Sequence, residues 1–182
     1  MYDLLILSLL SSRSMSGYKL ATVLGSTVVP RRKISNGVLY PVLNRMEKAG
    51  YIEGYDCHSR NAKVFDITDA GQDYLLDLIN KPVGQDGNRD NAYYFKFRSF
   101  SYLENDKKAE ILTDYRNAVL TDKNIYAELV QHYQDETKDH PDREDFYQWG
   151  LKTIEMKNQI ADTKIAWIDS RLQELGGKET HE

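Results

Sequence analysis

The stretch from position 35 to position 52 constrains the fold of this chain more than any other. Ser35 can cap a helix start, and Gly50 stands where a glycine commonly ends a helix. Between them an apolar stripe recurs at helical spacing: Val38, Leu39, Val42, Leu43 and Met46. The opposite face carries hydrogen-bonding and cationic groups of the kind that bind base edges and phosphates: Asn36, Tyr40, Asn44, Arg45 and Lys48. The pattern predicts an amphipathic helix with a face suited to DNA.

A β-hairpin is predicted directly after this helix. Residues 51–57 alternate in polarity, residues 58–62 form a polar turn, and residues 63–67 favour a second strand. Thr68 or Asp69 then caps the start of a further helix. A polar amphipathic helix followed by a hairpin with a basic tip indicates a winged helix-turn-helix.

The motifs in this region resemble those of the PadR family of bacterial transcriptional regulators. Residues 37–52 spell G-V-L-Y-P-V-L-N-R-M-E-K-A-G-Y-I, and I-T-D-A-G follows the hairpin at 67–71. Upstream, the apolar residues 4–10 and S-G-Y-K-L at 16–20 are similar to the first two helices of that family. The resemblance covers residues 3–76 and continues more weakly through residues 89–90 and 94–98. The remaining length fits the subgroup with a long helical C-terminal domain.

The fold class expected from these patterns is mainly α with a small β-wing. We expect helices at residues 2–11, from Ser14 or Ser16 to about Leu24 with Gly25 as its end, at 35–49, and from Thr68 to about Asn80. A linker rich in Gly, Pro and turn-forming residues follows. The predicted domains are a winged-helix domain at 1–80, a linker at 81–90 and a helical dimerisation domain at 91–182.

Two long helical patterns fill most of the last domain, with a turn expected at residues 135–142. In the first, residues at 111, 115, 118, 125, 129 and 132 recur at helical spacing. In the second, the predicted dimerisation residues keep a heptad rhythm: Leu151, Ile154, Asn158, Ala161, Ile165, Ile168, Leu172 and Leu175. This predicts an antiparallel helix pair with an apolar seam. A monomer would expose that seam, so a homodimer is expected, with Asn158 fixing its register.

Charge is segregated along the chain. The net charge is −4, which argues against a generic nucleic-acid binder. Residues 13–63, however, contain nine Lys or Arg and three Asp or Glu, whereas residues 81–182 contain fifteen and twenty. Binding to double-stranded DNA would therefore depend on a local basic surface that dimerisation doubles.

Four groups of residues are candidate DNA contacts. They are the start of the second helix (Ser16, Tyr18, Lys19), a cationic run (Arg31, Arg32, Lys33), the recognition helix (Ser35, Asn36, Tyr40, Asn44, Arg45) and the wing (His58, Arg60, Asn61, Lys63). The PadR family usually has an aromatic pair where this chain has its cationic run. Two alternatives stay open: Tyr18 could pack in the core, and Arg45 could pair with Glu47, Glu53 or a phosphate.

Function follows from these features and from the family. We expect a sequence-specific transcriptional regulator, a repressor, that binds a pseudo-palindromic operator as a dimer. The resemblance implies release by an aromatic acid or drug-like effector. Four aromatic residues could line its pocket, or could simply be core: Tyr94, Phe97, Trp149 and Trp167. The alternative is a coiled-coil-type structural adaptor without specific DNA binding.

Other classes of protein find little support in the sequence. It has no phosphate-binding glycine loop, nucleophile elbow or H-E-x-x-H motif, so an enzyme is not expected. Its single cysteine, Cys57, excludes an internal disulfide and a multi-cysteine metal site, and we expect no metal or cofactor. No apolar run is long enough to cross a membrane, which favours a cytoplasmic location.

Overall fold

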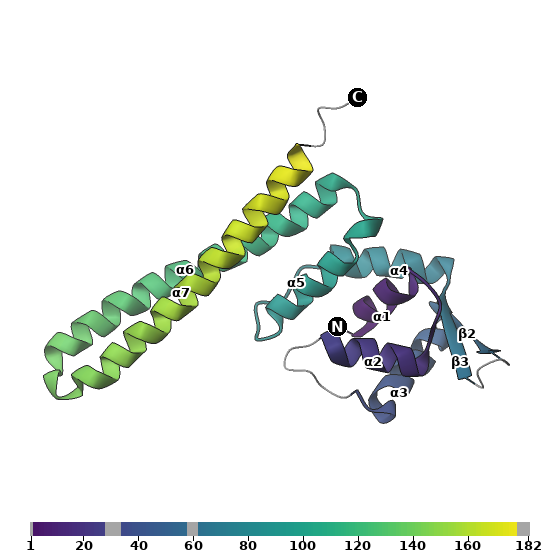
Figure 1. Ribbon diagram of the computed structural model, residues 1–182, viewed down its shortest axis with the longest axis horizontal. Coiled ribbons are helices and arrows are strands. Elements are labelled where there is room, and N and C mark those ends of the chain that lie inside the picture. Colours follow the sequence, from purple (N-terminus) through teal and green to yellow (C-terminus); the bar gives the residue numbers. More distant parts are fainter. Residues whose placement is uncertain (1, 28–33, 58–61, 178–182) are drawn as a thin grey trace. The chain divides into compact units, whose positions relative to one another are not determined.

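The computed structural model of this chain describes residues 2–27, 34–57 and 62–177. It divides into two compact units, Met1–Tyr102 and Leu103–Glu182. Figure 1 shows the helices and strands of both units with their labels. Each unit has its own core and is described separately.

The first unit contains helices around a small sheet. Its elements in chain order are α1 (Tyr2–Leu10), β1 (Met15–Ser16), α2 (Gly17–Thr27), α3 (Asn36–Lys48), β2 (Ile52–Cys57), β3 (Ala62–Ile67), α4 (Asp69–Asn80), α5 (Arg89–Arg98) and the 3₁₀ helix η1 (Phe100–Tyr102). Deeply buried side chains come from all the α-helices of this unit and from β2 and β3, among them Ile6, Leu20, Leu43, Phe65 and Phe95. Together with the helical second unit, this confirms the predicted fold class, mainly α with a small β-wing.

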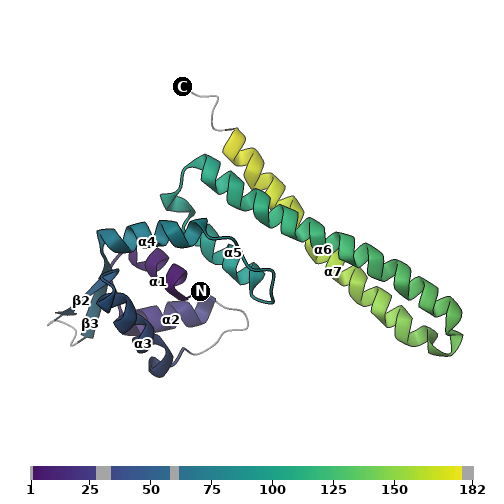
Figure 2. The same ribbon diagram turned by 180° about the vertical axis from the view of Figure 1, so that it is seen from behind.

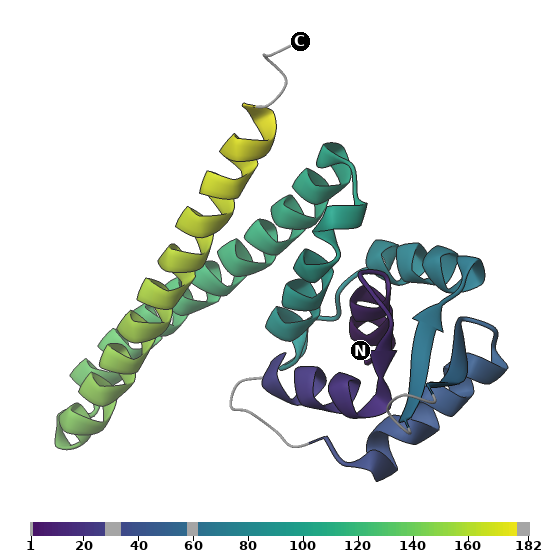
Figure 3. The same cartoon turned by 45° about the vertical axis from the view of Figure 1, so that its right-hand side comes forward.

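The sheet has three antiparallel strands in the order β1-β3-β2. Ile52 is paired with Ile67 in the hairpin, and Met15 of β1 is paired with Phe65 of β3. In Figure 1 the hairpin lies at one edge of this unit, and Figure 3 shows the same side turned forward. The strand β1 was not expected from the sequence, because its two residues are too few to show alternation.

Local signals placed most helix ends of this unit correctly. Gly50 has a φ of 76° and follows the C-cap Ala49, as expected of a glycine that ends a helix. Ser35 occupies the N-cap of α3, although its hydroxyl makes no capping hydrogen bond. The expected helix end at Gly25 is wrong, because α2 continues to Thr27 and Gly25 is buried within it. A glycine inside a helix is tolerated, and here it lies in the core.

Thr68 and Gly71 join α4 to the end of α3 and the start of the hairpin. The hydroxyl of Thr68 accepts from the Gly71 N–H at 3.1 Å and donates to the Gly50 carbonyl at 2.6 Å. The Thr68 N–H donates to the carbonyl of Tyr51 at 3.2 Å. A Cβ at Gly71 would overlap that same carbonyl oxygen, so only glycine fits. The I-T-D-A-G motif is therefore a joint between three elements.

The helix α5 packs on α1 and belongs to the first unit. Tyr93 and Phe95 are buried, and the hydroxyls of Ser8 on α1 and Ser99 after α5 share a buried hydrogen bond. The Lys96 ammonium donates to the Lys81 carbonyl at 2.6 Å. These contacts put the division between the units after Tyr102, beyond the segment 81–90 that composition marked as a linker.

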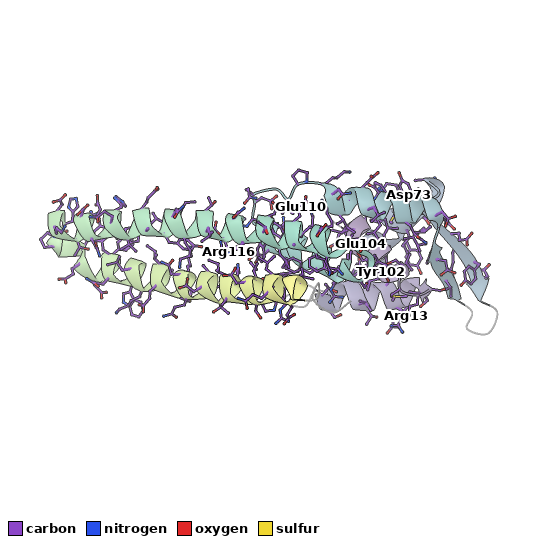
Figure 4. All side chains as sticks on the ribbon, turned by 90° about the horizontal axis from the view of Figure 1, so that it is seen from above. Arg13, Asp73, Tyr102, Glu104, Glu110 and Arg116 are labelled. Atoms are coloured by element: carbon purple, nitrogen blue, oxygen red, sulfur yellow. The ribbon has the colours of Figure 1, made fainter. Side chains whose placement is uncertain are left out.

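The second unit is an antiparallel pair of long helices, α6 (Asn105–Asp139) and α7 (Glu144–Gly176), joined by the 3₁₀ helix η2 (Pro141–Arg143). Figure 2 shows the two helices side by side along most of their length. Arg116, labelled in Figure 4, donates to Asp169 at 2.7 Å, and Lys123 pairs with Asp162. The two ion pairs are seven residues apart on each helix and run in opposite chain directions, as expected of antiparallel helices. The connection is shorter than the expected turn at 135–142, because α6 continues to Asp139.

The apolar seam of this pair is largely filled within one chain. Ile154, Ala161 and Ile168 of α7 are buried in the same unit as Ile111 and Tyr115 of α6. The expectation that a monomer would expose the apolar residues of this seam is therefore wrong for these three. Leu151, Asn158, Ile165, Leu172 and Leu175 are half-buried. On α6, Ile125 and His132 are exposed and do not extend the seam as predicted.

Candidate nucleic-acid interface

The outward face of α3 is a narrow line of four residues. Successive helical residues turn by about 100°, so Gly37, Pro41, Asn44 and Lys48 project in nearly one direction. All four are exposed, whereas Leu39, Leu43 and Met46 on the opposite side are buried. Gly37 and Pro41 carry little side chain, so the backbone of α3 can come close to a partner surface. Asn44 and Lys48 then supply the polar groups.

Tyr40 flanks this line on the side of α2. Its hydroxyl lies against Gly17, where an added Cβ would stand only 2.7 Å from the oxygen. The tyrosine is 37% exposed, so part of its ring covers the start of α2 while part faces outward. Tyr40 therefore connects the two helices of the helix-turn-helix as well as presenting a hydroxyl at its surface.

The start of α2 presents a cluster of polar groups beside Tyr40. The Ser16 hydroxyl accepts from the Lys19 N–H at 3.3 Å, as an N-cap does. Tyr18 is 81% exposed, which rules out the alternative that it packs in the core. Lys19 is also exposed. Hydroxyls, an ammonium group and a helix N-terminus together favour a bound phosphate.

Arg45 flanks the line on the other side and has a partner within the chain. Its Nη2 lies 2.6 Å from Oδ1 of Asp3 on α1. This hydrogen bond, together with the charge of Asp3, raises the pKa of Arg45 above its usual value. The partner is not Glu47 or Glu53, the two carboxylates considered from sequence. The side chain remains 56% exposed.

Lys63, the described cation of the wing, is also paired within the chain. Its Nζ lies 2.8 Å from each carboxylate oxygen of Glu47 on α3. The N–H of Gly54 on β2 donates to the same carboxylate at 3.1 Å. The recognition helix and both wing strands therefore meet at one carboxylate.

Lys48 and Arg13 are exposed cations that stand outside the four groups of candidate contacts drawn from the sequence. Lys48 lies on the outward line of α3, on the polar face to which its helical spacing assigned it. Arg13 is exposed in the loop between α1 and β1 and is labelled in Figure 4. A lone arginine between two elements gives no signal in the sequence. Six candidate contacts lie outside the described residues: Arg31, Arg32, Lys33, His58, Arg60 and Asn61.

The four aromatic residues predicted to line an effector pocket cannot all line one pocket within a chain. Tyr94 and Phe97 belong to the first unit, where their ring centroids are 6.3 Å apart. Trp149 and Trp167 lie five turns apart on α7, about 27 Å at 1.5 Å per residue, so they cannot line one pocket within a chain. Both are exposed, with Lys152 and Arg171 placed over their rings.

Two other kinds of site are absent from the described parts of the chain. No group of three or more His, Cys, Asp or Glu residues there could hold a metal ion. None of the described helices is both long enough and apolar enough to cross a membrane.

Comparison with known proteins agrees with this geometry in the first unit. Residues 6–77 match the model of the transcriptional regulator PadR-like family. No curated protein matches the chain in sequence. Solved structures similar to it include a transcriptional regulator from Clostridium thermocellum, with 29% identity over 41% of this chain and 75% of that one and a TM-score of 0.38.

Two further solved structures align over most of the chain. Bacillus subtilis PadR in complex with operator DNA has 18% identity, covering 95% of this chain and 98% of that one, with a TM-score of 0.41. The PadR-like regulator BC1756 from Bacillus cereus has 20% identity, covering 98% and 99%, with a TM-score of 0.40. Through residues 6–77, with the motifs that form its helix-turn-helix and wing, the chain belongs to the PadR-like family of transcriptional regulators.

Proposed function

We propose that this regulator is a sequence-specific repressor that places α3 in the major groove of its operator. The observation that carries the proposal is the exposed line of Gly37, Pro41, Asn44 and Lys48, opposite the buried face of the same helix. An α-helix fits the major groove of B-DNA, where an Asn amide can pair with the N6 and N7 of adenine. Lys48 would reach a phosphate beside that groove.

The start of α2 is the proposed anchor on the DNA backbone. Ser16, Tyr18 and Lys19 surround the helix N-terminus, and Tyr40 reaches it from α3. In a helix-turn-helix the first helix crosses the backbone while the second enters the groove. A phosphate bound here would fix the depth at which α3 sits.

The other candidate DNA contacts drawn from the sequence are not equally well supported by the structure. Arg45 and Lys63 have carboxylate partners within the chain, so they are not proposed as main phosphate contacts. Arg31, Arg32 and Lys33 stay predicted phosphate contacts from sequence. His58, Arg60 and Asn61 stay predicted contacts of the wing. Ser35 and Asn36 are exposed at the start of α3 and remain candidates for groove contact.

A C₂ homodimer is proposed, built on the exposed face of α7. Trp149, Met156, Ile160 and Trp167 are exposed and fall on one side of that helix by their spacing. This stripe replaces the buried Ile154, Ala161 and Ile168 as the proposed contact between subunits. Two recognition helices about 34 Å apart would then bind a pseudo-palindrome.

An aromatic effector is proposed to bind at α5, where Tyr94 is exposed next to Phe97. A panel of phenolic acids added to the protein–DNA complex tests this directly. At least one should release the DNA from the wild-type protein and fail to release it from a Tyr94→Ala variant. If no acid releases the DNA, or the variant responds as the wild type does, the proposed effector site is wrong.

The DNA-binding function itself is tested by selection. The full chain is used to enrich duplexes from a random library. The enriched duplexes are then titrated beside scrambled duplexes of equal length. We expect enrichment of half-sites about 10 base pairs apart. A variant with Arg31, Arg32 and Lys33 changed to Ala should show a salt slope smaller by about 0.9 for each lost phosphate contact. No enrichment would favour the adaptor alternative and overturn the proposal.

A further inference from the structure

Glu47 joins the recognition helix to both strands of the wing. Its carboxylate accepts the N–H of Gly54 from β2 at 3.1 Å, and both of its oxygens lie 2.8 Å from the ammonium of Lys63 on β3. The side chain is 30% exposed and that of Lys63 is 38% exposed. One carboxylate near the end of α3 therefore holds a backbone donor of one strand and a cation of the other.

Gly54 lets this arrangement exist. A Cβ at that position would collide with Cε of Lys63 and would stand 2.7 Å from Oε1 of Glu47. Lys63 also lies over the ring of Phe65, with its Nζ 5.3 Å from the ring centroid. The lysine stem is thus laid across β2 towards α3 and packed against a core aromatic residue. A side chain at position 54 would push it away.

The pairing changes what each charge can do near DNA. A carboxylate beside phosphates is repelled, and its pairing with an ammonium cancels most of that repulsion. The same pairing neutralises the ammonium of Lys63 with a carboxylate of the protein, so its charge is less available to a DNA phosphate. A half-exposed ion pair adds little to folding stability, so its main effect is on geometry and local charge.

We infer that Glu47 is a positioning residue, which fixes the wing relative to the recognition helix and holds Lys63 away from the DNA backbone. This rests on the DNA-binding function proposed above. It makes Glu47 a determinant of operator preference without a base contact of its own. Because the carboxylate binds both strands, its loss would let the hairpin turn against α3. It would also free one ammonium group for non-specific phosphate contact.

The main test is the isosteric Glu47→Gln variant of the full chain. Its affinity is measured for the duplex selected by the wild type and for a scrambled duplex, over a range of salt. The preference for the selected duplex should fall about tenfold, roughly the effect of one mismatched base pair. Affinity for the scrambled duplex should stay or rise, and its salt slope should grow by up to about 0.9 as Lys63 reaches a phosphate.

Three further variants separate positioning from simple charge or folding effects. Glu53→Gln removes the same charge from an exposed position on β2 and should keep the preference. Gly54→Ala should reproduce the loss seen with Glu47→Gln, because it displaces Lys63 while keeping the carboxylate. The double variant Glu47→Gln with Lys63→Met removes both charges and should leave the salt slope at the wild-type value. Melting curves check that each variant is folded at the assay temperature.

The outcomes distinguish this inference from the function on which it rests. A wild-type protein that prefers no duplex would overturn the proposed function. With a wild type that does prefer one, unchanged preference in Glu47→Gln would overturn the role of Glu47 alone. A slope reduced by about 0.9 in the double variant would show that Lys63 contacts a phosphate directly, which also overturns the inference.

Discussion

At the scale of single residues, Gly71 illustrates how a missing side chain allows two elements to meet. A Cβ there would overlap the carbonyl oxygen of Tyr51 and stand 2.9 Å from its carbonyl carbon. Gly71→Ala should therefore lower the free energy of unfolding by about 1–3 kcal/mol, the usual range for overpacking. Denaturant titration measures this. Gly87→Ala is the control, because nothing lies within 4 Å of its added Cβ; equal losses in both would contradict the close contact.

Asn44 and Lys48 should differ in what they give to DNA binding. Asn44→Ala should weaken binding to the selected duplex by ~1–3 kcal/mol and change binding to a scrambled duplex little, because a base contact carries the preference. Lys48→Met should weaken both and reduce the salt slope by about 0.9. Anisotropy titrations at several salt concentrations measure both effects. Arg45→Met serves as the comparison, and its slope should not change because Asp3 already binds that cation. A loss of slope in Arg45→Met but not in Lys48→Met would reverse the assignment.

At the scale of elements, α7 has one face that stabilises the chain and another proposed to bind a second subunit. Ile168 is fully buried within the helix pair, whereas Ile160 is exposed. Ile168→Ala should destabilise the second unit by about 2–5 kcal/mol, since it leaves a cavity. Ile160→Ala should leave the monomer's stability nearly unchanged and weaken the dimer. Thermal melts and sedimentation at several protein concentrations separate the two effects, and a dimer unaffected by Ile160→Ala would place the contact elsewhere.

Replacing Asn158 tests how much a polar side chain in the same helix lowers the stability of the protein. It is half-buried and lies between the buried Ile154 and Ala161. Asn158→Leu should raise the melting temperature, as for polar residues at coiled-coil seams, because it lies in the seam between α6 and α7 of one chain. Calorimetry measures this change. A lower melting temperature would mean that the asparagine makes a hydrogen bond on which the helix pair depends.

At the scale of the whole molecule, the division after Tyr102 sets where the chain can be cut. A fragment ending at Tyr102 should fold and stay monomeric, whereas one ending at Asn80 should be much less stable. The shorter fragment lacks Tyr93, Phe95 and the Ser99 that pairs with Ser8 on α1. Circular dichroism melts compare the two. Equal stability would show that α5 is dispensable to the first unit.

The longer fragment also tests the role of the second unit. Without a dimer, two half-sites are no longer bound at high effective concentration. Affinity for the full operator should fall by about 10²-fold, while affinity for an isolated half-site changes little. Light scattering and titration on both duplexes measure this. A fragment that dimerises, or that binds the full operator like the intact chain, would assign residues 103–182 another purpose.

The sequence by itself determined the elements and the family. Helical spacing, capping residues and the glycine at position 50 are local signals, and they located α3, the hairpin and α4 to within a residue or two. The PadR-like motifs lie in the same region because they encode these local joints. Thr68 is an example, since its hydroxyl accepts from the N–H of Gly71, three residues further along the chain.

Only the tertiary structure decided which charged and apolar residues remain available to a partner. Arg45 pairs with Asp3 and Lys63 with Glu47, across 42 and 16 positions of sequence, and no local pattern predicts such partners. The seam of α7 was likewise correct in its periodicity, yet three of its residues are buried against α6. Periodicity shows which side of a helix is apolar, but the packing of distant segments determines what covers it.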